Sequence, residues 1–253
     1  MRGAFVAEEG FSLVAIDYSQ IELRIAAMLS NDSALVDIFR RGEDVHTGVA
    51  IRVFSVDAAA VTKEMRRKAK VINFGILYGM GVNALRQNLG PETSRAEAQE
   101  FLNAYFNTFS RLAEYLEETK AFARSHGYTE TMFGRRRYFP GIGSSAPFLR
   151  ASAERMAINA PIQGTEGDIL RIAMIRVHEF FAAEGITHEA RMLMQVHDEL
   201  LFEVAHEKLE TVVPALRSLM QNVFAGKETH DVPIEVDVEV GENWYKMEPW
   251  QAK

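Results

Sequence analysis

The stretch that decides the fold of this chain is Met192-Leu-Met-Gln-Val-His-Asp-Glu-Leu-Leu-Phe-Glu-Val204. Its apolar runs at 192–196 and 200–204 flank the polar triplet His197-Asp198-Glu199. Two short apolar runs on either side of a few polar residues are typical of a β-hairpin. We therefore predict two antiparallel strands with acidic residues at their turn.

Further strands are predicted at both ends of the chain. The apolar run 11–16 ends at Asp17, and residues 20–29 have the spacing of an amphipathic helix. Over 234–240, apolar residues alternate with acidic ones, which is typical of a strand with one face in water. Between residues 32 and 138 the signals are almost all helical. This order predicts an α+β fold, in which an antiparallel sheet has helices on one side and a helical subdomain inserted into it.

One long helix is predicted inside the helical block. It begins at the capping-box sequence Ser94-Arg-Ala-Glu97 and ends at Gly127. Its apolar residues recur on one face, and we interpret them as core: Phe101, Tyr105, Phe109, Leu112 and Leu116.

Composition excludes several classes of protein. The 253 residues include no cysteine, so the chain forms no disulfide, thiolate zinc site or iron–sulfur cluster, and it suits a reducing cytoplasm. The net charge of -7 argues against a protein that coats nucleic acid indiscriminately, since such binding needs an excess of Lys and Arg. The longest uncharged stretch, 71–85, is too short and too polar to cross a bilayer. Any contact with nucleic acid must therefore use local patches.

A first candidate site is the pair Asp17 and Asp198, each at the end of an apolar run. If the two strand ends are neighbours in one sheet, two carboxylates meet there, and Mg²⁺ prefers such oxygen ligands. Two bound ions clamp the attacking and leaving oxygens of a phosphoryl transfer. The alternative is that each Asp only forms a turn, although the adjacent Glu199 makes this less satisfactory for the hairpin.

A second candidate is the segment 62–79, which carries five basic residues in the nine positions 62–70. On a helix, Arg66, Lys70 and Phe74 recur every four residues, and Tyr78 lies roughly 120° around from Arg66. Cations suit a polyphosphate and aromatic rings suit a base, so this face could hold a nucleotide. A charged helix start is equally typical of a solvated face. No phosphate-binding glycine loop is present in the sequence.

A third candidate combines the basic segment 134–138 with Arg155, Asn159 and Gln163, which follow helical spacing. Arg, Asn and Gln are the side chains that reach phosphates and groove edges. Taken singly, each is more typical of a surface arginine or of a capped helix end before Pro161.

Three of these segments resemble motifs A, B and C of the family A DNA polymerases, in order and spacing. They are Asp17-Tyr-Ser-Gln-Ile-Glu-Leu-Arg24, the helix 66–79 and Gln195-Val-His-Asp-Glu199. The similarity covers essentially the whole chain, through Gly241-Glu-Asn-Trp244. Three long motifs in one order are a highly specific signal.

The resemblance implies a right-hand polymerase architecture. Residues 1–32 and 148–253 would form the palm, with motif C in a hairpin at about 191–204, and 33–147 would form helical fingers around the motif B helix at 62–79. Because motif A begins so close to Met1, the thumb is expected to be absent. A fragment, or a split subunit completed by an upstream chain that supplies the thumb and the remaining palm, is therefore expected.

The resemblance also implies roles for individual residues. Asp17 and Asp198 would bind two Mg²⁺ ions, with Mn²⁺ as a substitute, the carbonyl of Tyr18 would add a ligand, and Glu199 would be an auxiliary catalytic acid. His46, Arg66 and Lys70 would bind the incoming triphosphate, and Lys70 would assist the leaving pyrophosphate. Phe74 would pack on the sugar and base, Tyr78 would stack near the templating position, and Glu22 would exclude a ribose 2′-hydroxyl. Primer–template DNA would contact Gln20, Arg155, Asn159, Gln163 and His197.

The resulting expectation is DNA-templated transfer of a deoxynucleotide to a primer 3′-hydroxyl, in replication or repair, in a bacterial cytoplasm or a phage-infected cell. A single-subunit RNA polymerase is one alternative, but Glu22 opposes it because such an enzyme needs the 2′-hydroxyl. A remnant that binds primer–template or nucleotide without turnover is a second alternative. Metal-dependent nucleotide hydrolysis is a third.

Overall fold

The computed structural model describes residues 2–251 and divides the chain into two compact units. The sheet unit comprises Met1–Ile21, Glu166–Lys227 and Ile234–Lys253. The helical unit comprises Glu22–Thr165 and Glu228–Pro233. The division reflects contacts within the chain and does not identify a palm or fingers. The predicted boundaries of palm and fingers therefore stay a prediction.

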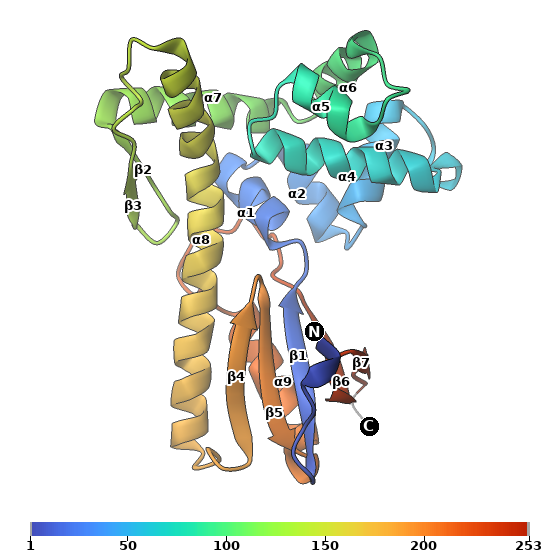
Figure 1. Cartoon of the computed structure of the whole chain (residues 1–253), viewed down its shortest axis with the longest axis vertical. Coiled ribbons are helices and arrows are strands. Elements are labelled where there is room, and N and C mark those ends of the chain that lie inside the picture. The colour runs from blue at the N-terminus through green and yellow to red at the C-terminus, as the bar shows by residue number, and fades with distance from the viewer. Residues whose placement is uncertain (1, 252–253) are drawn as a thin grey trace. The chain divides into compact units, whose positions relative to one another are not determined.

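A five-stranded antiparallel sheet forms the centre of the sheet unit, in the order β4-β5-β1-β6-β7 (Figure 1). Its strands are β1 (Phe11–Tyr18), β4 (Ala190–Val196), β5 (Glu199–Ala205), β6 (Val236–Asn243) and β7 (Lys246–Pro249). The predicted hairpin is confirmed as β4 and β5. Glu199 differs from the prediction, because it is the first residue of β5 and the turn contains only His197 and Asp198.

The two faces of this sheet have different neighbours. On one face, Phe202 of β5 contacts Phe181 of helix α8 (Pro147–Ala183), and the Tyr18 hydroxyl donates to the Met220 carbonyl in helix α9 (Leu209–Gln221). The opposite face carries a smaller apolar cluster of Leu13, Ala15, Leu201 and Trp244. Side chains alternate between faces along a strand, so Asp17 lies on the same face as Leu13 and Ala15. The 3-10 turns η1 (Arg2–Ala4) and η3 (His206–Lys208) complete the unit.

The helical unit contains a succession of helices joined by short loops (Figure 1). They are α1 (Ile21–Ser30), α2 (Ser33–Arg40), α3 (Val45–Phe54), η2 (Ala58–Ala60), α4 (Lys63–Leu77), α5 (Val82–Leu89), α6 (Arg95–Thr108) and α7 (Ser110–His126). The first part of α8 also belongs to this unit. Together with the antiparallel sheet, these helices confirm the predicted α+β class.

The predicted long helix from Ser94 to Gly127 is in fact two helices, α6 and α7. The capping box at Ser94 and the left-handed end at Gly127 are both present. Between them the backbone leaves the helix at Phe109, with φ -108° and ψ 59°. One oxygen of Asp32 accepts from the backbone N–H groups of Arg111 and Leu112, so a buried carboxylate from a distant loop caps the start of α7. Such a cap satisfies donors that a helix start leaves open, and it favours a new start at this point.

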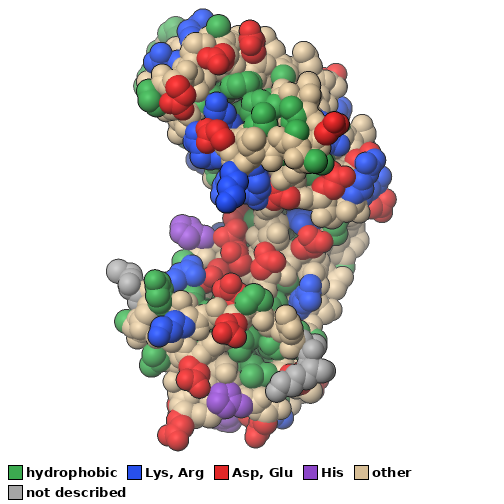
Figure 2. Space-filling model, turned by 90° about the vertical axis from the view of Figure 1, so that its right-hand side faces the viewer, with side chains coloured by type: hydrophobic (Ala, Val, Ile, Leu, Met, Phe, Trp, Pro, Cys, Tyr) green, Lys and Arg blue, Asp and Glu red, His purple; other side chains and the backbone are tan. Residues whose placement is uncertain are grey.

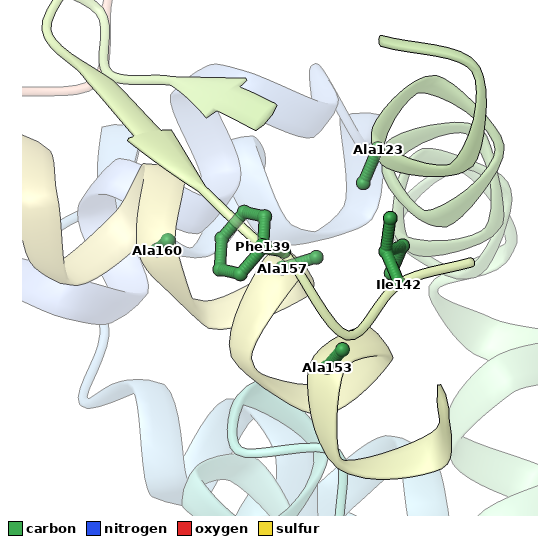
Figure 3. Packing of buried hydrophobic residues seen from close by; sticks show 6 residues of the cluster. All are labelled: Ala123, Phe139, Ile142, Ala153, Ala157 and Ala160. Atoms are coloured by element: carbon green, nitrogen blue, oxygen red, sulfur yellow. The ribbon is translucent and has the colours of Figure 1, made fainter. Parts of the chain in front are cut away.

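A small hairpin between α7 and α8 was missed by the helical interpretation of this region. It pairs β2 (Tyr128–Glu130) with β3 (Arg136–Tyr138). Phe139 and Ile142 follow β3 and pack against small residues of α7 and α8: Ala123, Ala153, Ala157 and Ala160 (Figure 3). These alanines let the segment approach the helix closely.

Helix α8 continues through Pro161 instead of ending before it, so the alternative of a helix end at this point is wrong. A proline inside a helix costs about 3 kcal/mol because it removes a hydrogen bond. Just before the proline, Ala157 and Ala160 are buried in the cluster around Phe139. Of the helices in residues 2–251, none combines the length and apolar character that a bilayer crossing requires.

Candidate active site

An acidic cluster lies at one end of the sheet unit. In the strand register, Asp17 of β1 stands directly opposite Glu199 of β5 on one side and Asp237 of β6 on the other. Residues directly opposite each other in an antiparallel pair project from the same face, so three carboxylates share this face. The prediction that Asp17 and the hairpin acids meet rested on the two strand ends being neighbours, and this register makes them neighbours.

Asp198 joins the cluster through the hairpin turn. His197 adopts φ 55°, which a tight two-residue turn needs at its first position. The backbone N–H of Tyr18 donates to the Asp198 carbonyl at 3.3 Å, and the Gln195 side chain donates to the His197 carbonyl at 2.5 Å. These bonds hold the turn against the end of β1.

Electrostatics distinguish Asp17 from an ordinary surface acid. The pKa of Asp17 is raised to about 7, mainly by burial and in addition by the neighbouring carboxylates of Asp198, Glu199 and Asp237. One carboxylate oxygen, Oδ1, is buried and accepts no hydrogen bond within the described residues. Figure 2 shows acidic side chains gathered at this end of the sheet unit. The cluster therefore contains negative charge that the surrounding side chains do not neutralise.

Glu199 is the exception in this cluster, because it has donors of its own. Its side chain is buried, and it accepts from the indole Nε1–H of Trp244 at 3.0 Å and from Arg2 at 3.4 Å. Glu199 is therefore held in place by protein groups, whereas Asp17 faces other acids.

The residues present fit a divalent cation. In residues 2–251, no three acidic or histidine side chains converge closely enough to hold an ion by themselves. Two carboxylates, Asp17 and Asp198, stand side by side with a buried oxygen that lacks a donor, and a bound cation would supply the missing positive charge. The backbone carbonyl of Tyr18 is the further oxygen that the motif resemblance assigns to this site.

A basic helix face lies on the helical unit. Helix α4 begins at Thr62, whose side chain accepts from the Met65 N–H, and it presents Arg66 and Lys70 to solvent. Phe74 is half-buried one turn later, and Tyr78 at the end of the helix is 41% exposed. The cations and the aromatic rings thus follow one another along the helix, as the spacing predicts.

Arg66 is held by a residue that the sequence interpretation missed. Its Nε and NH2 groups donate to the two oxygens of Asp44 at 3.0 and 2.7 Å. Asp44 is the N-cap of α3 and also accepts from the backbone and hydroxyl of Thr47 at 2.8 and 2.7 Å. Burial opposes the charged form, but hydrogen bonds from Arg66 and Thr47 outweigh it and hold the pKa of Asp44 well below its usual range. An Asp just before a helical pattern signals a cap, but nothing in the sequence links it to Arg66, 22 residues away.

His46 is less accessible than a triphosphate-binding role suggests. Its side chain is only 4% exposed, and its Nδ1 accepts from the Asn73 amide at 3.1 Å. Burial lowers the pKa of His46 to about 4, with Arg66 and Lys70 acting in the same direction and Asp44 opposing. The ring is therefore neutral near pH 7 and lies 5.9 Å from the Phe74 ring, centre to centre.

Glu22 and Tyr78 form a pair on the helical unit. The Tyr78 hydroxyl lies 3.0 and 2.9 Å from the two oxygens of Glu22. Gly79 follows with φ 67°, and a side chain there would come within 2.9 Å of Arg155 on α8. A glycine is thus required where the end of α4 passes close to α8.

The predicted DNA-binding residues fall into two sets. Gln20 and His197 belong to the sheet unit, and both have positive φ, 56° and 55°. Arg155, Asn159 and Gln163 lie on successive turns of α8 in the helical unit. Arg155 and Gln163 are exposed, whereas Asn159 has a buried Oδ1 with no hydrogen bond in the described part of the chain.

The basic segment of the hairpin is partly neutralised. Arg136 of β3 donates to Glu130 of β2 at 2.6 Å and lies over the Tyr128 ring at 4.5 Å. Its guanidinium is therefore committed within the hairpin.

Comparisons with known proteins agree on one family. The family model for DNA polymerase family A matches residues 1–246. The chain is 45% identical over 244 residues to the thermostable DNA polymerase I of Thermus filiformis, covering 96% of this chain and 28% of that protein. It is 46% identical over 244 residues to DNA polymerase I of Pseudomonas aeruginosa, covering 96% of this chain and 26% of that protein. The chain thus spans little more than a quarter of these relatives.

A solved structure gives the same result. The POL domain of Pol1 from M. smegmatis, in complex with DNA primer-template and dNTP, superposes with a TM-score of 0.89 at 43% identity. The match covers 96% of this chain and 42% of that one.

Proposed function

Since this chain belongs to DNA polymerase family A, we propose that it carries out DNA-templated DNA synthesis. In this reaction the 3′-hydroxyl oxygen of a primer forms a bond to the α-phosphorus of a dNTP. The bond to the β-phosphate oxygen breaks, pyrophosphate leaves, and the hydroxyl proton is released. The observation that supports this most directly is the placement of Asp17 beside Asp198, with a buried Asp17 oxygen that receives no hydrogen bond from any group in residues 2–251.

The acidic cluster is proposed to hold two Mg²⁺ ions, or Mn²⁺ in their place. Asp17 and Asp198 would contribute carboxylate oxygens, and Tyr18 would contribute its backbone carbonyl. Bound divalent ions supply positive charge that activates the hydroxyl and stabilises the charge developing on the phosphate oxygens. Glu199 is proposed as an auxiliary catalytic acid next to this pair, oriented by its bond from Trp244.

The basic face of α4 is proposed to bind the incoming triphosphate. Arg66 and Lys70 are exposed cations one turn apart, and Lys70 would neutralise or protonate the leaving pyrophosphate. His46 would act here as a neutral group, since its pKa is lowered to about 4 by burial. Phe74, half-buried beside His46, would pack on the sugar and base.

Selection of sugar and template is assigned to the remaining residues. Glu22, bonded by the Tyr78 hydroxyl, would occupy the space of a ribose 2′-hydroxyl, and Tyr78 would stack near the templating base. Primer–template DNA would contact five residues: Gln20, Arg155, Asn159, Gln163 and His197. An upstream polypeptide that supplies the thumb and further palm is a further proposed partner.

Primer extension tests the proposal. The 253-residue chain is given primer–template, Mg²⁺ and single dNTPs, with and without the upstream part of the polymerase domain of a relative. Incorporation of the nucleotide that the template dictates is expected, and it should require the primer. Loss of the template requirement, or hydrolysis of dNTP without a primer, would contradict synthesis and support nucleotide hydrolysis instead.

A matched pair of variants links the activity to the acidic cluster. Asp17→Asn keeps the shape of the side chain and removes its charge. Glu239→Gln removes a charge from the same sheet face, where Glu239 pairs with Ala15 two positions away from Asp17. Extension should be lost in the first variant and retained in the second. Equal activity in both would show that the cluster is not the catalytic site.

A further inference from the structure

The contact between Asp44 and Arg66 occupies one side of the guanidinium group. Arg66 donates through Nε and NH2, one bond to each oxygen of Asp44. Of the five N–H groups of an arginine, two are therefore used and three remain, and two of these three lie on the outer edge formed by NH1 and NH2. No other hydrogen bond of the Arg66 side chain is found within residues 2–251. The outer edge has the paired donors that match two oxygens of one phosphate.

The other partners of Asp44 make it a rigid anchor. Its Oδ1 caps α3 by accepting from the Thr47 N–H, and the Thr47 hydroxyl donates to the same oxygen. A carboxylate at the start of a helix is also stabilised by the helix dipole. Asp44 is thus fixed by α3, and it in turn fixes Arg66 of α4.

A second polar link fixes the same two helices to each other. In the first turn of α3, His46 accepts from Asn73 of α4. Asp44 and His46 of α3 thus bond Arg66 and Asn73 of α4, two polar links between the same two helices.

Charge is divided unequally along this face. The Asp44–Arg66 pair is neutral as a whole, because the two charges cancel at a distance. Lys70, one turn later, has no ion pair in the part of the chain that the structure describes. Attraction of an anion to this face therefore comes mainly from Lys70, and Arg66 contributes direction.

We propose that Asp44 is a positioning residue that holds the Arg66 guanidinium with its outer edge presented to the polyphosphate of the nucleotide. This inference rests on the proposed function, since it assumes that Arg66 meets the triphosphate. Without Asp44, the long Arg66 side chain must be ordered when the ligand binds, which costs affinity. Removal of the Asp44 charge acts in the opposite direction, because it leaves the Arg66 charge unpaired and strengthens attraction of an anion, so the measured affinity reports which of the two effects is larger.

Asp44→Ser is the variant that isolates this role. Serine is a good N-cap and keeps a hydroxyl acceptor for the start of α3, but it is too short and uncharged to hold a guanidinium. Binding of dATP and of inorganic tripolyphosphate to the full chain is measured by titration calorimetry. Both are expected to bind about three- to ten-fold more weakly. Unchanged or tighter binding would overturn the proposal and show that Asp44 only offsets charge.

Two backgrounds separate this proposal from its premises. In Arg66→Ala the ligands should bind more weakly, and adding Asp44→Ser should weaken them no further. If Asp44→Ser weakens binding equally with and without Arg66, Asp44 does not act through Arg66 and the proposal is wrong. If Arg66→Ala itself changes nothing, the proposed function has lost its triphosphate contact.

A control for helix capping completes the test. Ser94→Ala removes the cap of α6 in the same unit, where the capping box does not touch Arg66. It should lower thermal stability without changing tripolyphosphate affinity. A loss of affinity in Ser94→Ala as large as in Asp44→Ser would reduce the effect of Asp44 to general loosening of the unit and overturn the proposal.

Discussion

Asp17 and Asp44 are the same residue type in opposite surroundings. Asp17 is half-buried among other carboxylates, and its pKa is raised to about 7, first by burial and then by Asp198. Burial also opposes the charge on Asp44, but bonds from Arg66 and Thr47 hold its pKa well below the usual range. The acidic cluster of the sheet unit therefore keeps uncompensated charge, whereas the charge of Asp44 in the helical unit is neutralised by Arg66.

This difference has a physical consequence for each unit. Like charges in a partly buried cluster destabilise the fold unless a cation binds. Binding of a cation to the acidic cluster would therefore relieve this repulsion. Arg66 is already paired with the carboxylate of Asp44, so it has no such repulsion to relieve. Its guanidinium is instead oriented before an anion binds. The acidic cluster is thus suited to attract a cation, and the Asp44–Arg66 pair is suited to orient a bound phosphate.

Removal of the charge on Asp17 should have the largest effect. Asp17→Asn is expected to reduce primer extension by about 10³-fold, equal to about 4 kcal/mol, because the carboxylate would hold the metal ions. The same change should raise the melting temperature without Mg²⁺, since it relieves repulsion from Asp198. Millimolar Mg²⁺ should stabilise the unaltered chain more than the variant. Thermal unfolding with and without Mg²⁺ measures this, with Glu239→Gln as the control. An equal rise in melting temperature in all three proteins would show that Asp17 does not bind the ion.

Loss of the Arg66 guanidinium should have the next largest effect. Hydrogen bonds to charged groups contribute about 1.5–3 kcal/mol, so Arg66→Ala should weaken dNTP binding by about 10- to 100-fold. Arg67→Ala is the matched control, because Arg67 bonds Glu64 and the Leu89 carbonyl instead. Calorimetric titration with dATP compares them. A larger loss in Arg67→Ala would place the triphosphate on another face of α4.

Much of the fold was predictable from short-range sequence patterns. The hairpin and the strand before Asp17 were marked by short apolar runs, the helix within 62–79 by the spacing of its basic and aromatic residues, and all three are present. Such patterns depend only on neighbours along the chain, which is why periodicity detects them. The motif resemblance then supplied the roles of residues whose spacing alone left alternatives open.

Long-range pairings were not predictable in the same way. Asp237 joins the acidic cluster only because β6 pairs with β1 in a register that the alternation near 234–240 does not specify. Asp44 reaches Arg66, and Asp32 caps α7, through tertiary contacts between separate segments. Helix α8 continues through Pro161, although a proline is a local signal for a helix end. In each case tertiary structure outweighed or extended the local signal.

Burial of His46 should make the stability of the helical unit depend on pH. Its pKa is lowered to about 4 by burial, against about 6.5 in the unfolded chain. Between these values the unfolded state binds more protons, so stability is present above pH 6.5 and is lost as pH falls towards 4. The charged groups around the ring are Asp44, Arg66 and Lys70. Urea unfolding at pH 7 and pH 4.5 should show roughly 1–3 kcal/mol more loss in the unaltered chain than in His46→Gln. Equal losses would mean that the ring is not excluded from water.

The smallest effect is expected at Glu199, the one acid of the cluster that has protein donors. Trp244→Phe keeps the ring in the apolar cluster of Leu13, Ala15 and Leu201 but removes the N–H that donates to Glu199 at 3.0 Å. The carboxylate then has only the longer contact from Arg2, and a buried charged acceptor that loses a donor costs about 1–2 kcal/mol. Trp250→Phe is the control, because Trp250 bonds Val238 through its backbone. Urea unfolding of the two variants measures the difference. If Trp244→Phe is no less stable than Trp250→Phe, the bond from Trp244 does not stabilise the Glu199 carboxylate. Glu199 would then not differ from Asp17 in this respect.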